Sequence, residues 1–389
     1  MLKLIEKKDF YDSLTSKNEV LNTYNKLTLI PSKNNVFYNA NTTEQINSKH
    51  VLSAKLFPCY LQPEFNTTEY EGLKKLPLNK INGFAIQIDK SSDIETFMKV
   101  NYSKNFRGNI KRAVSRFEIC FKVAYEMNYG SITESKYNSL MASLHGMLRE
   151  RFTQRNDKNK VLNNWDYYLQ SSFKLINEKK ASLFVIYQNQ IPVSICLNHH
   201  FNKILFISIP SYDINFSKFS LGNISIFKML EWGHENNYIL LDMAYGELDY
   251  KRRWSNYLYT FEHHIFYSQN KPIHSTVVFI EASIIKLKNY LKNINLDDLI
   301  TKIKNKLKKT FSPAPLELEY DIVFSENISI QNLKRIQQDS LDFSIIQKPV
   351  YDFLYREKIP MEIIEIFEIK KGKEYLVNYE NVNHRILIK

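Results

Sequence analysis

Apolar residues recur at helical spacing in the stretch NFRGNIKRAVSRFE, where Phe106, Ile110 and Phe117 fall on one face. Ser103 precedes the stretch in the position of an N-cap. Lysine and arginine occupy much of the remaining surface, so the pattern predicts a basic amphipathic helix. Two further helical patterns follow. The predicted helices span residues 104–116, 134–152 and 163–178.

The pattern becomes strand-like in three runs rich in β-branched and aromatic residues: ASLFVIYQ, IPVSICLNHHF and KILFISIPSY. Asn189 and Gln190 form a turn between the first two runs. Three strands in succession indicate an antiparallel meander. A helix then begins near Asn223, followed by a strand, a short helix through ELDYKRRW and a closing strand. The predicted strands lie at 181–188, 191–201, 203–212, 238–244 and 257–267, and the short helix lies at 247–254.

The ends of the chain have weaker patterns. Short β-like runs at 51–57 and 83–88 alternate with turn-rich joints, which predicts a small α+β unit near the N-terminus. A length of 389 residues, 44% of them hydrophobic, allows two or three domains. We expect domains at residues 1–100, 101–270 and 271–389.

A last helical pattern begins at residue 281. Ile284, Leu287 and Leu291 recur among lysines, which predicts a pair of basic amphipathic helices reaching residue 309. A lysine-rich outer face of a packed helix and contact with an anionic membrane surface are both open interpretations. Prolines follow at 313 and 315, and the strand-like and helix-like runs of residues 316–389 cannot be placed.

Composition narrows the class of protein. With 24% charged residues, 25 tyrosines and 25 phenylalanines, the chain is neither disordered nor collagen-like. A net charge of +12 favours anionic partners, although the lysine-rich composition inflates it. The three cysteines lack the spacing of a zinc site or a disulfide framework. No signal peptide and no run approaching the ~20 apolar residues of a membrane span is found, so we expect a cytoplasmic protein.

Glycine placement points to a phosphate site. Only nine glycines occur, yet Gly222, Gly233 and Gly246 fall close together. Gly222 follows a strand and precedes a helix, where free backbone N–H groups and the helix dipole attract phosphate. The alternative is that Ser220 or Asn223 only caps the helix. The predicted pyrophosphate-binding residues are Ser220, Leu221, Gly222, Asn223 and Ile224.

The order of elements from the meander to the closing strand resembles the catalytic half of a GNAT acyltransferase. Within that superfamily, three stretches resemble the FemABX-like branch and its polysaccharide-biosynthesis (CelD-like) relatives: NFRGNIKRAVSRFE, SLGNISIFKMLEWGHENNYILLDMAYG and ELDYKRRW. The resemblance covers about residues 100–268. It implies a mixed α/β (α+β) GNAT fold, with two GNAT-like units in tandem, the first degenerate, and a C-terminal helical extension.

The resemblance also implies roles for residues near the short helix. Tyr250 is the candidate general acid for the leaving thiolate, and Lys251 the candidate for stabilising negative charge. Their alternatives are a packed aromatic and a solvated helix face. Glu247 is the preferred general base. Asp249, Asp213, His199 and His200 are the other candidate bases.

Several polar residues have simpler interpretations. His199 and His200 are adjacent on a strand and point to opposite faces, so they cannot form a paired metal site, and we expect them to be structural. His263 and His264 repeat this pattern. Asp242 lies in a buried-looking strand, where a carboxylate needs hydrogen bonds.

The basic helix could grip an anionic acceptor, or its charges could be ordinary surface charge. Backbone N–H groups at the end of the third strand of the meander, near Tyr212, would receive the thioester oxygen according to the resemblance. The candidate substrate-binding residues are Arg107, Lys111, Arg112, Tyr212 and Asp213.

The leading function is an N-acyltransferase that moves an acyl group from acyl-CoA to an amine acceptor, an amino sugar or similar carbohydrate amine, in envelope or polysaccharide synthesis. It needs acyl-CoA, acetyl-CoA or longer, as co-substrate and no metal. One alternative is a Fem-type transferase that uses aminoacyl-tRNA and a peptidoglycan precursor, which the positive charge would suit. Another is an inactive GNAT-fold binding protein. The expected location is cytoplasmic, with peripheral contact at the inner face of the membrane left open.

Overall fold

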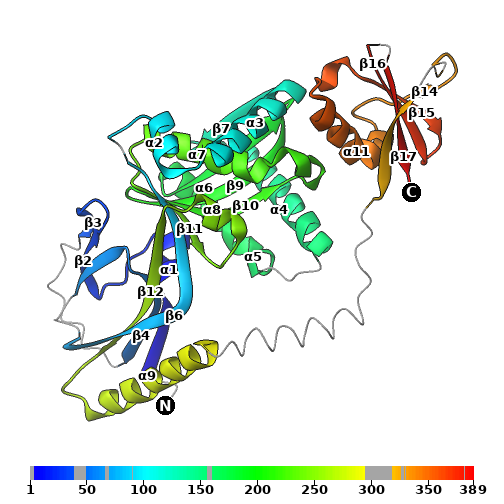
Figure 1. Ribbon diagram of the computed structural model, residues 1–389. Coiled ribbons are helices and arrows are strands. Elements are labelled where there is room, and N and C mark those ends of the chain that lie inside the picture. The colour runs from blue at the N-terminus through cyan, green and yellow to red at the C-terminus, as the bar shows by residue number, and fades with distance from the viewer. Residues whose placement is uncertain are drawn as a thin grey trace.

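The structure is a computed structural model, and it describes residues 4–38, 50–65, 70–89, 91–155, 160–293, 318–325, 328, 330–380 and 382–389. A nine-stranded mixed sheet organises most of these residues (Figure 1). Across the sheet, the strands are β1 (Ile5–Asp9), β4 (Val51–Pro58), β12 (Tyr257–Tyr267), β6 (Gly72–Gln87), β11 (Leu240–Tyr245), β10 (Ile204–Tyr212), β9 (Ile191–Phe201), β8 (Ala181–Gln188) and β7 (Val123–Asn128).

Helices cover both faces of the β8–β10 part of the sheet. Alternate side chains of β9 point to opposite faces, as the two-residue period of a strand requires. Ile195 and Leu197 join the apolar cluster of α4 (Glu134–Arg155) and α6 (Trp165–Asn177). Ser194 on the other face bonds Ser225 of α7 (Leu221–Glu235) at 3.0 Å between the two Oγ atoms, and α3 (Lys104–Cys120) packs beside α7. Two cores therefore sandwich the meander.

The remaining elements complete the N-terminal and central parts of the molecule. A small second sheet packs near β4 and β12. Its strands are β2 (Tyr24–Leu29), β3 (Asn34–Tyr38) and β5 (Leu61–Phe65). The other helices are α1 (Phe10–Ser16), α2 (Ile94–Asn101), α5 (Lys160–Asn163), the 3-10 helix η2 (Ile214–Phe219), α8 (Asp249–Trp254) and α9 (Pro272–Asn293).

The predicted core elements are confirmed. The strands at 181–188, 191–201 and 257–267 coincide with β8, β9 and β12, and the other predicted strands and helices of residues 101–270 match within a few residues. Both meander pairs are antiparallel. Asn189 and Gln190 have φ angles of 46° and 66°, as a tight hairpin turn requires. Ser103 caps α3 by accepting a hydrogen bond from Phe106 N–H at 3.2 Å.

Residues before 101 contribute to the same large sheet. β6 lies between β11 and β12, and both pairings are antiparallel. β4 extends the sheet beyond β12, and β1 pairs with it in parallel. The run predicted at 51–57 is β4, and the run at 83–88 is the end of the long strand β6.

The prediction for the helix beginning at 281 is wrong in two respects. α9 begins at Pro272, and its inner face is formed by Val277, Val278, Ala282 and Ile285 against β4, β6 and β12. Ile284, Leu287 and Leu291 are exposed instead. The second helix expected up to residue 309, with the two prolines after it, lies outside the described residues.

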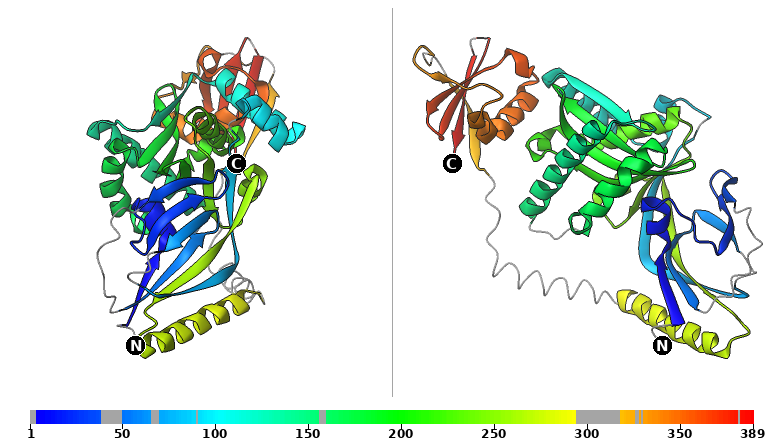
Figure 2. Two further views of the ribbon diagram at one scale, coloured as in Figure 1. Left: turned by 90° about the vertical axis from the view of Figure 1, so that its left-hand side faces the viewer. Right: turned by 180° about the vertical axis from the view of Figure 1, so that it is seen from behind.

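The segment that could not be placed forms a module of its own, residues 318–389 (Figure 2). Its helix α11 (Leu341–Glu357) packs on a five-stranded sheet. The strands, in sheet order, are β13 (Tyr320–Ser325), β17 (Val382–Ile388), β16 (Glu374–Tyr379), β15 (Glu365–Lys370) and β14 (Lys334–Arg335), with the short η3 (Met361–Ile363) after α11.

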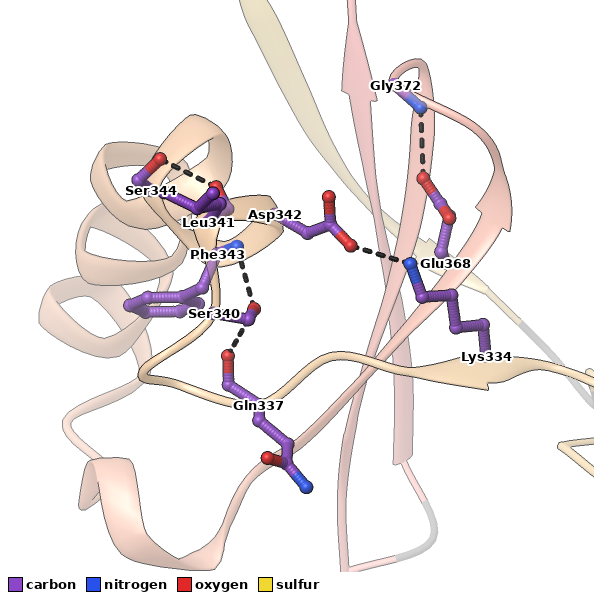
Figure 3. A network of polar contacts seen from close by, with 9 residues as sticks. All are labelled: Lys334, Gln337, Ser340, Leu341, Asp342, Phe343, Ser344, Glu368 and Gly372. Carbon is purple, nitrogen blue, oxygen red and sulfur yellow. Dashed lines mark hydrogen bonds and ion pairs between the residues drawn. The ribbon is translucent and has the colours of Figure 1, made fainter.

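Polar contacts fix the start of α11 to this sheet (Figure 3). Ser340 caps the helix by accepting from Phe343 N–H at 3.2 Å. The Lys334 ammonium on β14 donates to Asp342 in the first helical turn at 2.6 Å. α11 also packs on η2 and α3, so the C-terminal module lies against the central sheet's helical layer.

Candidate functional site

A gap opens between β10 and β11. The two strands pair in parallel only from Ile204 to Phe206 and from Leu240 to Asp242. Beyond this point, β10 shifts register against β9 at Ile207/Ile209, and β11 shifts against β6 between Asp242 and Tyr245. Parallel strands that stop pairing leave backbone N–H and C=O groups at the gap to bond a ligand or water.

The helix α7 begins beside this gap. Ser220 has a left-handed backbone (φ 57°), which ends η2 and starts α7. The Asn223 side chain accepts a hydrogen bond from Trp254 Nε1 at 3.0 Å, so it ties the start of α7 to α8. Gly222 lies against the Tyr212 ring, which would be 3.8 Å from a Cβ at that position. The first turn of α7 therefore lies on the same side of the sheet as α8.

A cavity of about 400 Å³ adjoins the start of α7. Arg112 and Arg116 of α3 and Arg253 of α8 line it together with Ser220 and Asn223. No carboxylate occurs among the described lining residues. The guanidinium of Arg116 also stacks on the ring of Tyr355 from α11, 4.4 Å from its centroid, and this ring forms part of the wall. Three guanidinium groups at a helix N-terminus are suited to an anion such as a phosphate.

Tyr250 and Lys251 lie on α8, which follows β11. Tyr250 packs against the core cluster that contains Leu221 and Ile224. Burial raises its pKa, the Cys196 thiol acts in the same direction, and the Arg151 guanidinium acts against both. The phenol thus keeps its proton at neutral pH, as a proton donor must.

Lys251 is only 6% exposed, and its ammonium donates to Tyr245 O at 2.7 Å. Burial lowers its pKa to about 8, although the nearby charge of Asp242 favours the protonated form. The side chain is therefore a buried cation close to the end of β11, and not part of a solvated helix face.

Other candidate bases make contacts of their own. Glu247 is exposed; it pairs with Arg252 and accepts from Asn82 Nδ2 at 3.4 Å. Asp249 sits in the first turn of α8. Asp213 caps η2 by accepting from Asn215 N–H at 2.8 Å; burial raises its pKa.

The predicted substrate-binding residues do not form one cluster. Arg107 donates to Tyr102 O at 2.6 Å and Lys111 lies 3.8 Å from Glu95, and both line a separate cavity of about 420 Å³. Arg112 instead lines the cavity at the start of α7. Tyr212 borders a third cavity, and Asp213 is its neighbour in sequence.

This third cavity is a cleft of about 980 Å³ between α4, η2 and the C-terminal module. Arg149 and Arg151 line it from α4, and Lys348 from α11. Glu150 is the one acidic residue among the described lining residues. The Arg151 guanidinium lies 5.0 Å from the centroid of the Tyr212 ring and acts on Tyr250, so the cleft extends toward α8.

The histidines make internal contacts. His200 bonds Tyr238 at 2.7 Å and Ser182 at 2.8 Å, and His199 bonds Ser208 at 2.8 Å. Burial lowers the pKa of His199 to about 4 and that of His200 to about 3. His263 and His264 are also buried and bonded to Ser53 and Tyr24. No group of three possible metal ligands occurs in the part of the chain that the structure describes.

Asp242 is fully buried at the gap between β10 and β11. It accepts hydrogen bonds from Tyr60 at 2.8 Å, from Tyr259 at 2.7 Å and from Ala244 N–H at 2.7 Å. This confirms the expectation that the carboxylate is hydrogen-bonded. Burial raises its pKa.

Sequence reasoning missed the contribution of the C-terminal module. Tyr355 and Lys348 come from a segment that could not be placed, far along the chain from α3 and α4. In the sequence, the only signal for Arg253 is its place within the ELDYKRRW stretch.

The family model described as "Acetyltransferase (GNAT) domain" matches residues 104–252. No curated protein matches the chain. Similar solved structures include FemX, with 10% identity over 58% of this chain and 74% of that one, at a TM-score of 0.39. The C-terminal domain of a putative lysylphosphatidylglycerol synthetase from Agrobacterium fabrum has 8% identity over 61% and 73%, at 0.38. L-PGS from Bacillus licheniformis has 10% identity over 61% and 74%, at 0.36.

The family match agrees with the mixed α/β arrangement of the core. The matched residues contain α3, the β8–β10 meander, α7, β11 and the start of α8. The chain therefore has a GNAT fold, and its residues 104–252 are similar to a GNAT acetyltransferase domain, which is a transferase domain.

Proposed function

We propose that the protein is an N-acyltransferase that moves an acyl group from acyl-CoA to an amine acceptor. The observation that carries the proposal is the cavity at the start of α7, where Arg112, Arg116 and Arg253 converge without a carboxylate. A diphosphate bound there would accept hydrogen bonds from these guanidinium groups and from the N–H groups of Leu221 and Gly222. The N–H groups of Asn223 and Ile224, which the sequence also suggested, already donate to Ser220 O at 2.9 and 3.2 Å. The thioester arm would then run toward the gap between β10 and β11.

The proposed chemistry uses residues on both sides of that gap. The acceptor nitrogen attacks the thioester carbonyl carbon, a C–N bond forms, and the C–S bond breaks. Tyr250 gives its phenolic proton to the departing thiolate, and Lys251 stabilises negative charge in the transition state. Glu247 takes the amine proton through water and passes it to the solvent, because its carboxylate is exposed. Its ion pair with Arg252 keeps the carboxylate deprotonated before the reaction.

The acceptor is proposed to enter through the cleft of about 980 Å³. The size is at the upper end of the usual range for ligand sites. Arg149, Arg151 and Lys348 favour an acceptor that carries an anionic group, such as a nucleotide-linked amino sugar. Tyr212 and Asp213 at the end of β10 would then lie between donor and acceptor, whereas Arg107 and Lys111 would be outside the site.

The biological process, the branch of the superfamily and the domain division are proposals as well. We propose a place in envelope or polysaccharide synthesis, within the FemABX-like and CelD-like part of the GNAT superfamily. Residues 1–100 would be a degenerate first unit, residues 101–270 the catalytic unit and residues 271–389 an extension. An aminoacyl-tRNA donor is the alternative.

Calorimetric titration with coenzyme A tests the donor site. We expect wild-type protein to bind it, and Arg253→Gln to bind it about tenfold more weakly, since a charge-assisted hydrogen bond is lost. Arg335→Gln is the matched control, because this arginine pairs with Glu365 on the C-terminal module, away from the cavity. The proposal would be contradicted if wild-type protein did not bind coenzyme A but bound aminoacyl-tRNA.

Acetyl transfer tests the chemistry. With acetyl-CoA and a panel of amino sugars and their nucleotide derivatives, we expect free thiol to be released, and Tyr250→Phe to lower kcat about a hundredfold. Coenzyme A affinity should stay unchanged in this variant. An unaltered kcat in Tyr250→Phe would remove the general acid from the proposal while leaving the donor site intact.

A further inference from the structure

The helix α9 exposes an unusual number of large apolar side chains. No other helix in the described part of the chain carries more than two that are exposed. In α9 they are Ile273 (55%), Phe279 (69%), Ile284 (40%), Leu287 (56%), Tyr290 (62%) and Leu291 (38% exposed). Single exposed apolar residues are ordinary, but a continuous row on one helix indicates a contact surface.

The row forms one stripe along the helix. At about 100° per residue, the six side chains fall within an arc of about 140°. The buried residues Val278, Ala282 and Ile285 occupy the opposite arc, and the buried Val277 borders the stripe beside Ile284. These four residues fix α9 to β4, β6 and β12. One apolar face thus holds the helix on the protein, and the second faces outward. We call this second face the outer stripe.

The charged side chains of α9 that border the outer stripe are all positive. Lys286 and Lys288 are exposed and fall on its two borders in the same helical projection. Glu281 is the only acidic residue of α9, and it lies on the inner side. There it pairs with Lys7 at 2.8 Å and accepts from Ser53 at 3.2 Å. Thr276 and Ser283 also fall within the arc, and their hydroxyls donate to main-chain oxygens of the same helix at 3.5 and 2.8 Å. The outer stripe is therefore mainly apolar, with cationic edges.

We propose that the outer stripe of α9 docks on an anionic membrane surface. An interfacial helix buries such an apolar face at the boundary of headgroups and acyl chains, while lysines reach the phosphates. Within the described residues, no helix is long and apolar enough to cross a bilayer. α9 lies at the end of the molecule remote from the C-terminal module (Figures 1 and 2), and the side chains of its outer stripe are exposed.

Charge complementarity favours a membrane over a second copy of the chain. In a two-fold contact the same patch meets itself, so the lysines bordering one outer stripe would approach those of the other. Two sets of lysines that approach each other in a dimer would repel and weaken the contact. Anionic lipids would instead attract these lysines. The proposal does not depend on acyl transfer, because it uses no residue of the α7 cavity or of the cleft.

Vesicle sedimentation of the full chain tests this proposal. The vesicles contain either phosphatidylcholine alone or equal parts of phosphatidylcholine and phosphatidylglycerol. We expect binding to the anionic vesicles, and a decrease as salt is raised. The Phe279→Glu/Leu287→Glu variant should bind about tenfold or more weakly, because two apolar anchors are lost and two negative charges gained. Lys286→Gln/Lys288→Gln should lose mainly the preference for anionic vesicles.

The matched control is Ile191→Glu/Phe324→Glu, which makes the same kind of change at residues that are 61% and 62% exposed elsewhere. It should bind vesicles like wild type. All four positions are on the surface, so the variants should fold, and circular dichroism checks this. Equal binding by wild type and Phe279→Glu/Leu287→Glu overturns the proposal. A wild-type dimer that this variant converts to monomer also overturns it. So does a wild-type monomer that does not bind anionic vesicles.

Discussion

Lys251 places a nearly buried ammonium group beside the proposed reaction site. Its pKa of about 8 means that it is mostly charged at pH 7 and loses its proton as the pH rises through 8. If the charge stabilises the transition state, kcat should fall about tenfold for each pH unit well above 8. Rate measurements from pH 6.5 to 10 on wild-type protein test this expectation.

Lys251→Arg supplies the control, because a guanidinium stays charged throughout this range. Its pH profile should remain flat above pH 8, even if its rate is lower at every pH because the longer side chain fits Tyr245 O less well. A wild-type profile without any decline would mean that the ammonium only holds the end of β11 through its bond to Tyr245.

The sequence could identify residues whose role follows from local geometry. Ser220 lies at the start of α7 and lines the cavity, as the sequence suggested, although η2 and not a strand precedes it, and Gly222 is already inside the helix. The partner residues could not be predicted, because Arg116 and Tyr355 meet through tertiary packing of distant segments. Arg107 shows the opposite error: its basic character suggested a ligand, but its guanidinium bonds main-chain carbonyls of its own neighbourhood.

At the scale of elements, β6 and β12 pair over most of their length and join the two halves of the large sheet. Two glycines of β6 lie opposite tyrosines of β12, Gly72 opposite Tyr267 and Gly83 opposite Tyr259. A Cβ at Gly83 would lie 2.1 Å from the Tyr259 ring, which covers the glycine. The same ring carries the hydroxyl that bonds Asp242.

Gly83→Ala should therefore destabilise the protein by about 1–3 kcal/mol, since Tyr259 must leave its place and its bond to the buried carboxylate weakens. Gly108→Ala is the matched control: nothing lies within 4 Å of its Cβ position in α3. It should stabilise by about 0.5–1 kcal/mol through helix propensity. Urea unfolding measures both, and a neutral Gly83→Ala would show that the Tyr259 ring moves aside without cost.

Elements with a clear period could be predicted, and those without one could not. β8, β9 and β12 are rich in β-branched and aromatic residues and are bounded by turn residues, so their limits could be predicted. α11 contains Pro349, which normally marks a helix boundary, and its sheet partner β14 has only two residues. The period of α9 was visible, but both of its faces are apolar, so the pattern could not tell which one packs on the sheet.

At the scale of the whole molecule, the C-terminal module is joined to the GNAT domain by an aromatic cluster. Tyr351 of α11 is 3% exposed, and its ring centroid lies 5.0 Å from that of Phe121 and 4.5 Å from that of Phe216. Cys120 Sγ donates to Leu354 O at 3.4 Å beside them. Phe216 belongs to η2, the element that directly precedes Ser220, so module docking and the start of α7 share one set of contacts.

Tyr351→Ala should therefore act at a distance. Loss of the ring leaves a cavity at the docking contact and costs about 3–5 kcal/mol of unfolding free energy. Tyr351 does not line the α7 cavity, yet coenzyme A should bind several-fold more weakly, because Tyr355 and η2 lose their fixed positions. Leu341→Ala on the same helix, at a residue 88% exposed, should change neither quantity. If Tyr351→Ala weakens folding but leaves coenzyme A affinity at the wild-type value, then the module is anchored to the GNAT domain without shaping its donor site, and the wall formed by Tyr355 is incidental.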